Sequence, residues 1–251
     1  MEIQYSKLQI EITRLCNQAC KFCCRGKAQN VHQSKDNIDA LFDNNDIKSI
    51  DTLMFSGGEP TLNGILVDYI ADKIIKQEIP VDRFISSING LSYSEDLVRG
   101  FTKLKDYIIQ TSDYERLCPG ILMITQDQFH AEANPKVVEK LSNLSYFSPI
   151  LKIEVPKENM LPYGYATINH LTDAIPDLSE LTDYQKNYDI VTENGKTYLY
   201  IEYQYISSNG NVVNDGCQTY ELMDQYALGN VKNQKLEDIY LSPEEKRLYL
   251  H

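Results

Sequence analysis

The spacing of hydrophobic residues divides most of the chain into short segments of two kinds. Apolar or alternating runs typical of strands occupy residues 8–13, 51–55, 81–86, 121–125 and 150–155. Between these runs, apolar residues recur at helical spacing over residues 37–45, 65–77, 97–109 and 137–144. Strands that alternate with helices in this way predict an α/β fold with a parallel sheet, built from right-handed βαβ units.

The carboxy-terminal part has a different pattern. Residues 169–189 are polar and poorly patterned, so the sequence predicts only a helix or a loop there. Residues 198–207 alternate strictly and give the strongest strand signal in the chain. Asn209-Gly210 then predicts a hairpin turn, with Val212-Val213 returning as the second strand.

Composition limits the kind of protein that this chain can be. Its 251 residues are 42% hydrophobic, which suffices for one α/β domain with a sizeable core. The 24 basic and 36 acidic residues give a net charge of -12, which repels phosphate backbones and makes a nucleic-acid partner unexpected. The sequence shows no signal peptide and no apolar run of membrane-spanning length, so we expect a cytoplasmic protein without a membrane partner. Its six cysteines should stay reduced in that compartment, which suits metal binding.

Three of these cysteines form a Cys-x3-Cys-x2-Cys cluster, Cys16, Cys20 and Cys23, directly after the first predicted strand. Soft thiolate ligands select iron–sulfur clusters or zinc over harder cations. Three thiolates can hold three irons of a four-iron cluster and leave the fourth iron open, which is typical of reactive metal sites. The alternative is a structural zinc ion held by the same cysteines and the adjacent Cys24, because neighbouring cysteines can both ligate.

A second motif, Ser56-Gly57-Gly58-Glu59-Pro60, ends the second predicted strand. Gly57 and Gly58 lack a Cβ, so they allow the backbone to approach a ligand closely and should leave their amides and carbonyls available. The Glu59 carboxylate can accept a hydrogen bond from a ligand ammonium group, and Pro60 stiffens the turn before the next helix. Alone, the motif is more typical of a surface turn; with the cysteines it indicates ligand binding.

The two motifs together resemble those of the radical S-adenosylmethionine (SAM) superfamily. Cys16, Cys20 and Cys23 match its Cys-x3-Cys-x-aromatic-Cys loop with Phe22 at the aromatic position, and residues 57–60 match its Gly-Gly-Glu-Pro motif. The resemblance implies an incomplete TIM-type barrel, a partial (β/α)6 fold, whose strand ends carry a [4Fe-4S] cluster and SAM.

The resemblance also implies the chemistry. The amino and carboxylate groups of SAM would chelate the open iron, and one electron would cleave SAM to methionine and a 5'-deoxyadenosyl radical that abstracts hydrogen from a substrate. The protein would position this reagent and exclude competing reactions. An external one-electron donor such as flavodoxin or ferredoxin is then an expected partner.

Residues after the third and fourth predicted strands are further candidates for this site. Ser87 and Asn89 lie in a segment similar to the family's Ser/Thr-x-Asn-Gly sequence, which the resemblance places near the ribose or carboxylate of SAM. Asn89-Gly90 is equally typical of an ordinary turn. Asp127 and His130 can bind ribose or substrate, and His130 can exchange a proton near neutral pH, although a lone histidine is more often only hydrogen-bonded.

Residues 162–166 follow the fifth predicted strand. A turn with Gly164 and Ala166 on either side of an aromatic residue can admit the adenine edge of SAM. The alternative, in which Tyr163 or Tyr165 only packs on the core, is nearly as well supported.

The last part of the chain resembles the extension found in peptide-modifying members of the superfamily. We therefore expect a barrel over residues 1–206 and an extension, with a short β-hairpin, over residues 207–251. Those members carry extra cysteines there for auxiliary clusters, whereas this region has only Cys217, with Cys118 and Cys24 elsewhere. We expect a cluster-free extension. Cys217 can give a hydrogen atom to a substrate radical, but a small apolar filler is the safer interpretation of both Cys118 and Cys217.

Three functions remain open at this point. The extension and the 18 tyrosines favour a radical enzyme that acts on a peptide. The second is the same chemistry on a small molecule such as a nucleotide or sugar. The third is a non-catalytic iron–sulfur electron carrier or a zinc-stabilised binding module.

Overall fold

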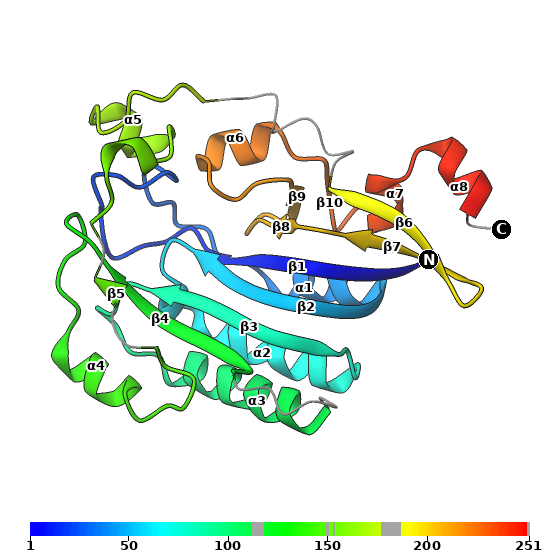
Figure 1. Ribbon diagram of the computed structural model, residues 1–251, viewed down its shortest axis with the longest axis horizontal. Coiled ribbons are helices and arrows are strands. Elements are labelled where there is room, and N and C mark those ends of the chain that lie inside the picture. The colour runs from blue at the N-terminus through cyan, green and yellow to red at the C-terminus, as the bar shows by residue number, and fades with distance from the viewer. Residues whose placement is uncertain (112–117, 149–150, 153, 177–186, 250–251) are drawn as a thin grey trace.

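The computed structural model describes residues 1–111, 118–148, 151–152, 154–176 and 187–249 (Figure 1). Ten strands lie in these ranges: β1 (Glu2–Thr13), β2 (Asp46–Gly57), β3 (Val81–Ile88), β4 (Gly120–Gln126), β5 (Leu151–Lys152), β6 (Tyr188–Glu193), β7 (Lys196–Ile201), β8 (Gln204–Ile206), β9 (Asn211–Val213) and β10 (Gly229–Asn230). They form one open sheet with the order β10-β9-β8-β1-β2-β3-β4-β5, to which the β6–β7 hairpin joins through β7 and β1.

The strands from β1 to β5 are parallel to their neighbours, which confirms the α/β class with a parallel sheet. The helices between and after them are α1 (Lys35–Asp43), α2 (Gly64–Lys76), α3 (Glu95–Thr111), α4 (Pro135–Leu141), α5 (Gly164–Ile168), α6 (Tyr220–Gln225), α7 (Leu236–Tyr240) and α8 (Pro243–Tyr249). Two 3-10 turns, η1 (Pro60–Asn63) and η2 (Lys157–Asn159), complete the set among the described residues. None of these helices combines the length and apolarity needed to cross a membrane.

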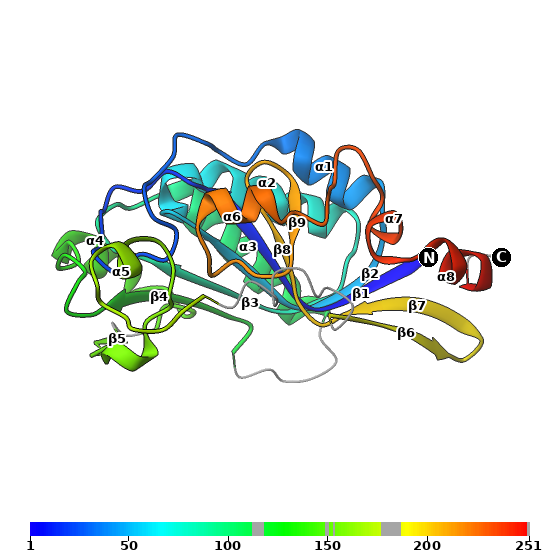
Figure 2. The same cartoon turned by 90° about the horizontal axis from the view of Figure 1, so that it is seen from above.

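One face of the sheet is covered by α1, α2 and α3, as Figure 2 shows. Alternate strand residues such as Leu53 and Phe84 point into this layer and are fully buried. The ring of Phe84 stacks on that of Phe101 of α3, with centroids 4.8 Å apart. The strand residues that alternate with these buried ones therefore point to the opposite face of the sheet, which we call the open face.

The predicted elements occur in the expected order, but their ends differ. The first strand starts at Glu2 rather than residue 8, because Ile3 and Tyr5 are also buried as β1 pairs with both β2 and β7. The run at 198–207 is divided at residues 202–203 between β7 and β8. The fifth strand is reduced to β5; residues 150 and 153 of the predicted 150–155 lie outside the described residues.

One hairpin was missed. Strand β6 begins at the end of the stretch assigned to a helix or loop, of which residues 177–186 lie outside the described ones. It turns into β7 through Asn194 and Gly195, whose φ values of 51° and 76° fit the mirror-image turns of hairpins. The Asn-Gly pair was the available signal, but β6 is half exposed and has little apolar alternation to support it.

The second hairpin is confirmed. Strands β8 and β9 are antiparallel, and Gly210 between them has a φ of 80°. Because β8 also pairs with β1, the hairpin extends the same sheet on the side away from β2. The predicted boundary between residues 206 and 207 thus falls inside a hairpin whose two strands belong to one sheet.

Candidate active site

The cysteine loop, residues 14–31, leaves the carboxyl end of β1 and lies beside α5 (dark blue in Figures 1 and 2). Backbone bonds close its base: the Arg14 amide donates to the Val31 carbonyl at 2.8 Å, and the Gln29 amide donates to the Arg14 carbonyl at 3.1 Å. Within the loop, the Cys23 amide donates to the Cys20 carbonyl at 3.1 Å. The segment that carries the three cysteines thus forms a compact turn.

Two cavities meet at this turn, one of about 490 Å³ and one of about 360 Å³. Cys16, Cys20 and Cys23 line both, and all three are half-buried and free of disulfides. Gln18 also lines both, and its Nε2 atom is buried without a hydrogen-bond partner in the protein. Cys24 lines only the larger cavity.

These three thiols can serve as ligands of an iron–sulfur cluster. In the part of the chain that the structure describes, no three His, Cys, Asp or Glu side chains converge closely enough to hold one metal ion. A multi-iron cluster takes its thiolates on different irons, so its ligands need not meet at a point. The shared lining of two cavities by three thiols matches that requirement.

Burial favours the protonated form of the Cys16 and Cys20 thiols. Desolvation raises the pKa of Cys20 to about 12, with a smaller contribution from the neighbouring charges of Cys23 and Cys16. Desolvation also raises the pKa of Cys16. Metal binding at this loop must therefore release protons.

The two glycines of the second motif are needed for packing against the end of β1. Gly57 has a φ of 140°, and a Cβ on it would lie 2.2 Å from the Thr13 carbonyl oxygen. A Cβ on Gly58 would lie 2.3 Å from the Leu15 carbonyl oxygen. The Gly58 amide donates to the Thr13 carbonyl at 2.7 Å, so it is occupied rather than available as the sequence suggested.

Glu59 is buried, 1% exposed, and joins two loops of the site. Its Oε1 accepts from the Thr61 amide at 3.1 Å and the Thr61 hydroxyl at 2.7 Å, which caps η1. Its Oε2 accepts from the Asn89 amide at 2.8 Å. Burial raises the pKa of Glu59, although these hydrogen bonds counteract the rise. Pro60 begins η1 and lines the larger cavity with Glu59 and Asn89.

Asn89 continues this connection to the cysteine loop, because its side-chain amide donates to Oδ1 of Asn17 at 2.7 Å. Ser87 also lines the larger cavity, and its hydroxyl lies 2.9 Å from that of Thr125 on β4. The ends of β2, β3 and β4 therefore bring the predicted residues to one place.

Asp127 holds the segment after β4 in shape. Its Oδ1 accepts from the amides of Phe129 at 2.8 Å and His130 at 3.1 Å, and lies 2.9 Å from Nδ1 of His130. His130 and Phe22 line the larger cavity, and the Phe22 ring packs against the rings of Phe129 at 5.2 Å and His130 at 5.3 Å. Asp127 thus fixes the backbone of His130 beside the cysteine loop, while Nδ1 of His130 has no hydrogen-bond partner among the described residues.

The segment with Gly164 and Ala166 packs under the cysteine loop. Gly164 has a φ of 57°, and a Cβ on it would lie 2.5 Å from the carbonyl oxygens of Cys23 and Cys24. The Tyr165 amide donates to the Cys23 carbonyl at 2.9 Å, and Tyr165 lines the smaller cavity. Gly164 and Ala166 line neither cavity, and Gly164 contacts the cysteine loop.

The two remaining cysteines are exposed. Cys118 precedes β4, at the end of that strand away from the site. Cys217 lies outside the lining of both cavities, whereas the half-buried Cys24 lines the larger one. A ligand in the larger cavity would therefore meet the thiol of Cys24 and not that of Cys217.

A buried charge network behind the loop escaped the sequence analysis. Glu11, at 0% exposure, accepts from Nε of Arg14 at 2.9 Å and from the Tyr205 hydroxyl at 2.7 Å. Arg25, which lines the larger cavity, lies 3.7 Å from Glu11 and over the Tyr205 ring. The available signal was the pair of arginines flanking the cysteines, together with a glutamate within a buried strand.

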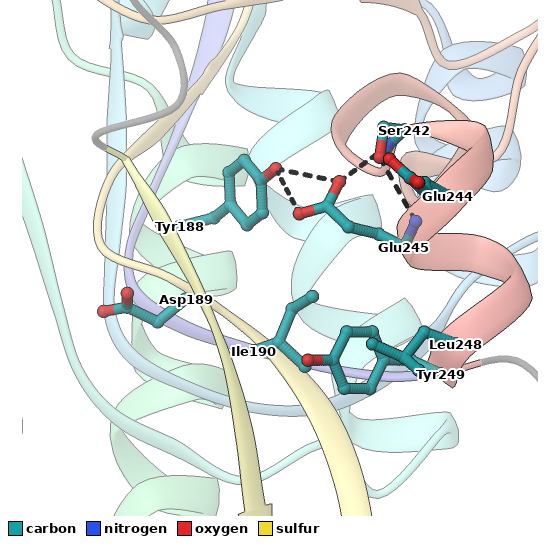
Figure 3. Close-up of a pocket in the computed structure, with 8 residues that line it drawn as sticks. All are labelled: Tyr188, Asp189, Ile190, Ser242, Glu244, Glu245, Leu248 and Tyr249. Carbon is teal, nitrogen blue, oxygen red and sulfur yellow. Dashed lines mark hydrogen bonds between the residues drawn. The ribbon is translucent and has the colours of Figure 1, made fainter.

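A further cavity of about 650 Å³ lies at the opposite end of the sheet, between β6 and α8 (Figure 3). Glu245 there accepts from the Tyr188 hydroxyl at 3.3 Å and from the Ser242 amide at 2.8 Å, which caps α8. Its lining contains no cysteine, so the chemistry of the predicted site lies elsewhere.

Comparisons with known proteins agree with this geometry. Residues 10–112 match the model of the Radical SAM superfamily. The structure "Native anSMEcpe with bound AdoMet and Cp18Cys peptide" aligns with a TM-score of 0.56 and 13% identity, over 100% of this chain and 83% of that chain. "Native anSMEcpe with bound AdoMet" aligns with a TM-score of 0.53 and 13% identity, over 97% and 82%. No curated protein matches the sequence.

The structural alignments confirm the expected fold class, an open sheet of the partial (β/α)6 barrel type. At such low identity they show the fold alone. The family match covers the part of the chain that contains both motifs, and it extends from β1 into the last residues of α3.

Proposed function

We propose that this chain, which matches the radical SAM superfamily over residues 10–112, is a radical SAM enzyme with Cys16, Cys20 and Cys23 as its cluster ligands. When bound, a [4Fe-4S] cluster and SAM would together supply a 5'-deoxyadenosyl radical that takes hydrogen from a substrate. The observation that carries the assignment is the shared lining of two cavities by these three thiols, next to the glycine motif.

The residues around the thiols have distinct roles in this proposal. Gly57 and Gly58 hold the β2 end against β1, while Glu59 and Pro60 fix the turn at the mouth of the larger cavity. Ser87 and Asn89 offer polar groups to the carboxylate or ribose of SAM from the end of β3. Phe22 belongs to the cysteine loop, and its ring packs on that of Phe129 in the segment after β4.

Three further roles complete the proposal. Asp127 fixes His130, which can hold or move a proton in the cavity. Gly164 packs the α5 segment against the cysteine loop, and the turn with Gly164 and Ala166 remains our candidate for receiving adenine although neither residue lines a cavity. Cys217, on the extension, remains our candidate for returning a hydrogen atom to a substrate radical.

We propose a peptide as the substrate. One of the aligned structures holds a bound peptide, according to its description, and it shares the fold over all of this chain. The sheet also continues past β1 into the extension, the part of the chain whose sequence resembles peptide-modifying members. A small molecule such as a nucleotide is the competing substrate class, and an external reductant such as flavodoxin or ferredoxin supplies the electron.

Anaerobic reconstitution tests the proposal. With iron, sulfide, SAM and dithionite, the full chain should bind about four irons and release 5'-deoxyadenosine, because thiolates hold such clusters. Cys118→Ala is the matched control, since this exposed thiol lies away from the site and its loss should change neither result. An electron carrier would bind iron but release no 5'-deoxyadenosine, and a zinc module would take zinc in place of iron.

Mass spectrometry of candidate substrates then tests the substrate class. A peptide encoded near this protein's gene should gain a mass change that depends on SAM. Turnover of a small metabolite, with no change in any such peptide, would overturn the peptide assignment while leaving the radical chemistry in place.

A further inference from the structure

The larger cavity has two chemically different ends. One end carries the three thiols and the glycine motif, and the other reaches down onto the open face of the sheet, where it is lined by Gln9, Met54, Ile85 and Met123. Its volume of about 490 Å³ lies within the range of small-molecule sites. None of these four residues has a role in the proposed function.

Three side chains form a continuous surface at this lower end. Met54 of β2 pairs with Ile85 of β3 in the sheet register. Met123 of β4 pairs with Ser87, which is two residues beyond Ile85 and therefore on the same face. All three are half-buried, and we call Met54, Ile85 and Met123 the apolar floor.

The floor itself carries no polar group, and two polar contacts beside it are made within the protein. Oε1 of Gln9 accepts from the Tyr203 hydroxyl at 2.9 Å, and the hydroxyls of Ser87 and Thr125 lie 2.9 Å apart. Of the charged residues in the lining, Arg25 lies 3.7 Å from Glu11 and Glu59 accepts three hydrogen bonds, and neither belongs to the floor. A charged ligand group placed on the floor would lose its hydration without gaining a partner, which costs free energy.

Methionine gives this surface a particular character. Its unbranched thioether side chain adapts its shape to different apolar groups and contacts aromatic rings favourably. Two methionines on either side of Ile85 therefore suit an aliphatic or aromatic group, and they would not distinguish closely related shapes.

We propose that the apolar floor is a subsite for an uncharged, apolar side chain of the substrate, next to the cofactor end of the cavity. This inference rests on the proposed function, because it takes the thiol end as the cofactor site. It narrows the substrate to a peptide with an aliphatic or aromatic residue at the modified position or beside it.

Binding of a neutral fluorescent probe, N-phenylnaphthylamine, to the full chain tests the subsite without turnover. Met123→Glu should weaken probe binding by about tenfold or more, because the new carboxylate has no partner on the floor. N-acetyl-leucinamide should displace the probe, whereas N-acetyl-lysinamide and N-acetyl-aspartamide should not. Ile109→Glu is the matched control, because Ile109 is 57% exposed and lies on α3, across the sheet from the floor.

Equal probe binding by Met123→Glu and the unchanged chain would overturn the inference, as would equal displacement by the leucine and lysine amides. Circular dichroism must show that the variant is folded. If it is not, Met123→Gln replaces it, because glutamine has a similar length without a charge, and binding should still weaken.

A second readout separates this inference from the proposed function. SAM cleavage is measured in the unchanged chain and in Ile109→Glu, and both should release 5'-deoxyadenosine in the absence of substrate, because Ile109 lies outside the cavity. Retained cleavage in these two proteins, with unchanged probe binding by Met123→Glu, would overturn the subsite alone. Failure of the unchanged chain to cleave SAM would overturn the proposed function, whatever the probe results.

Discussion

Arg14 and Asp224 form a two-pronged ion pair that fastens the extension to the base of the cysteine loop. Nη1 and Nη2 of Arg14 donate to the two Asp224 carboxylate oxygens, each at 2.7 Å. Arg14 is 1% exposed, and its Nε is bound by the buried Glu11. Asp224 lies in α6, so a helix more than 200 positions away in the sequence positions the residue that begins the loop.

The first prediction is that Asp224→Asn destabilises the protein. Breaking a fully buried pair costs several kcal/mol and an exposed pair costs little; Asp224 is 38% exposed, so we expect a loss of about 1–2 kcal/mol in the free energy of unfolding. Urea unfolding of the reduced, metal-free chain measures it. Asp173→Asn is the control, because Asp173 is 87% exposed in its pair with Lys157 and should give no measurable change.

The effect of Asp224 should depend on pH. Burial alone would raise the pKa of Asp224, but the hydrogen bonds and charge of Arg14 outweigh it and lower the pKa below its ordinary value of 3.8. The stabilisation is therefore present above pH 3.8 and is lost as the pH falls through the lower folded value. The stability difference between the unchanged chain and Asp224→Asn should be largest near neutral pH and shrink below 3.8; a constant difference would contradict this ion pair.

The second prediction concerns the cluster ligands. Cys16→Ala, Cys20→Ala and Cys23→Ala should each lose most of the bound iron after reconstitution, because the three thiols line the same cavities and each would hold a different iron in the proposed cluster. Cys24→Ala is the closest control in sequence and should retain its iron. Iron content and the visible absorption of the cluster are the measurements, and iron loss in Cys24→Ala alone would reassign the ligand set.

Sequence patterns predicted the buried parts of this fold better than its edges. The strands at 51–55 and 81–86 were found because their apolar residues fill the layer under α2 and α3. The hairpin of β6 was missed because β6 is held by pairing with β7 and is weakly buried. The first six residues of β1 were also missed, although Ile3 and Tyr5 are buried there. Pairing between distant segments leaves little mark on the local hydrophobic pattern.

The same distinction applies to the site. The cysteines and the Gly57-Gly58-Glu59 turn were predicted because their spacing along the chain is itself the signal. The apolar floor is formed by one residue from each of three strands, Met54, Ile85 and Met123, and depends on sheet register. The partner of Arg14 depends on where α6 returns to the sheet. No local spacing encodes either arrangement.

The third prediction separates two roles of Glu59. Glu59→Ala removes the acceptor of three hydrogen bonds from Thr61 and Asn89 and leaves buried donors unpaired, so it should lower the free energy of unfolding by about 1–3 kcal/mol. Thr61→Val removes only the hydroxyl bond and should cost about 0.5–1.5 kcal/mol. Urea unfolding measures both changes.

SAM binding to the reconstituted variants, measured by calorimetry, completes this test. Glu59→Ala should weaken SAM binding, because Glu59 and the Asn89 loop that it holds line the larger cavity. Thr61→Val should bind SAM nearly as well as the unchanged chain, since Glu59 keeps its bond to Asn89. Unchanged SAM affinity in Glu59→Ala would limit Glu59 to a role in folding.

The fourth prediction compares the two thiols that are candidates for returning hydrogen to a substrate radical. If Cys217 does so, Cys217→Ala should still release 5'-deoxyadenosine but yield less reduced product, because hydrogen abstraction precedes the step that needs this thiol. Cys24 is the matched comparison, since its thiol lines the larger cavity whereas that of Cys217 does not. Product formed in deuterated buffer should carry deuterium from an exchangeable S–H group. Loss of that deuterium in Cys24→Ala, with normal labelling in Cys217→Ala, would transfer the role to Cys24 and leave Cys217 as an exposed thiol of the extension.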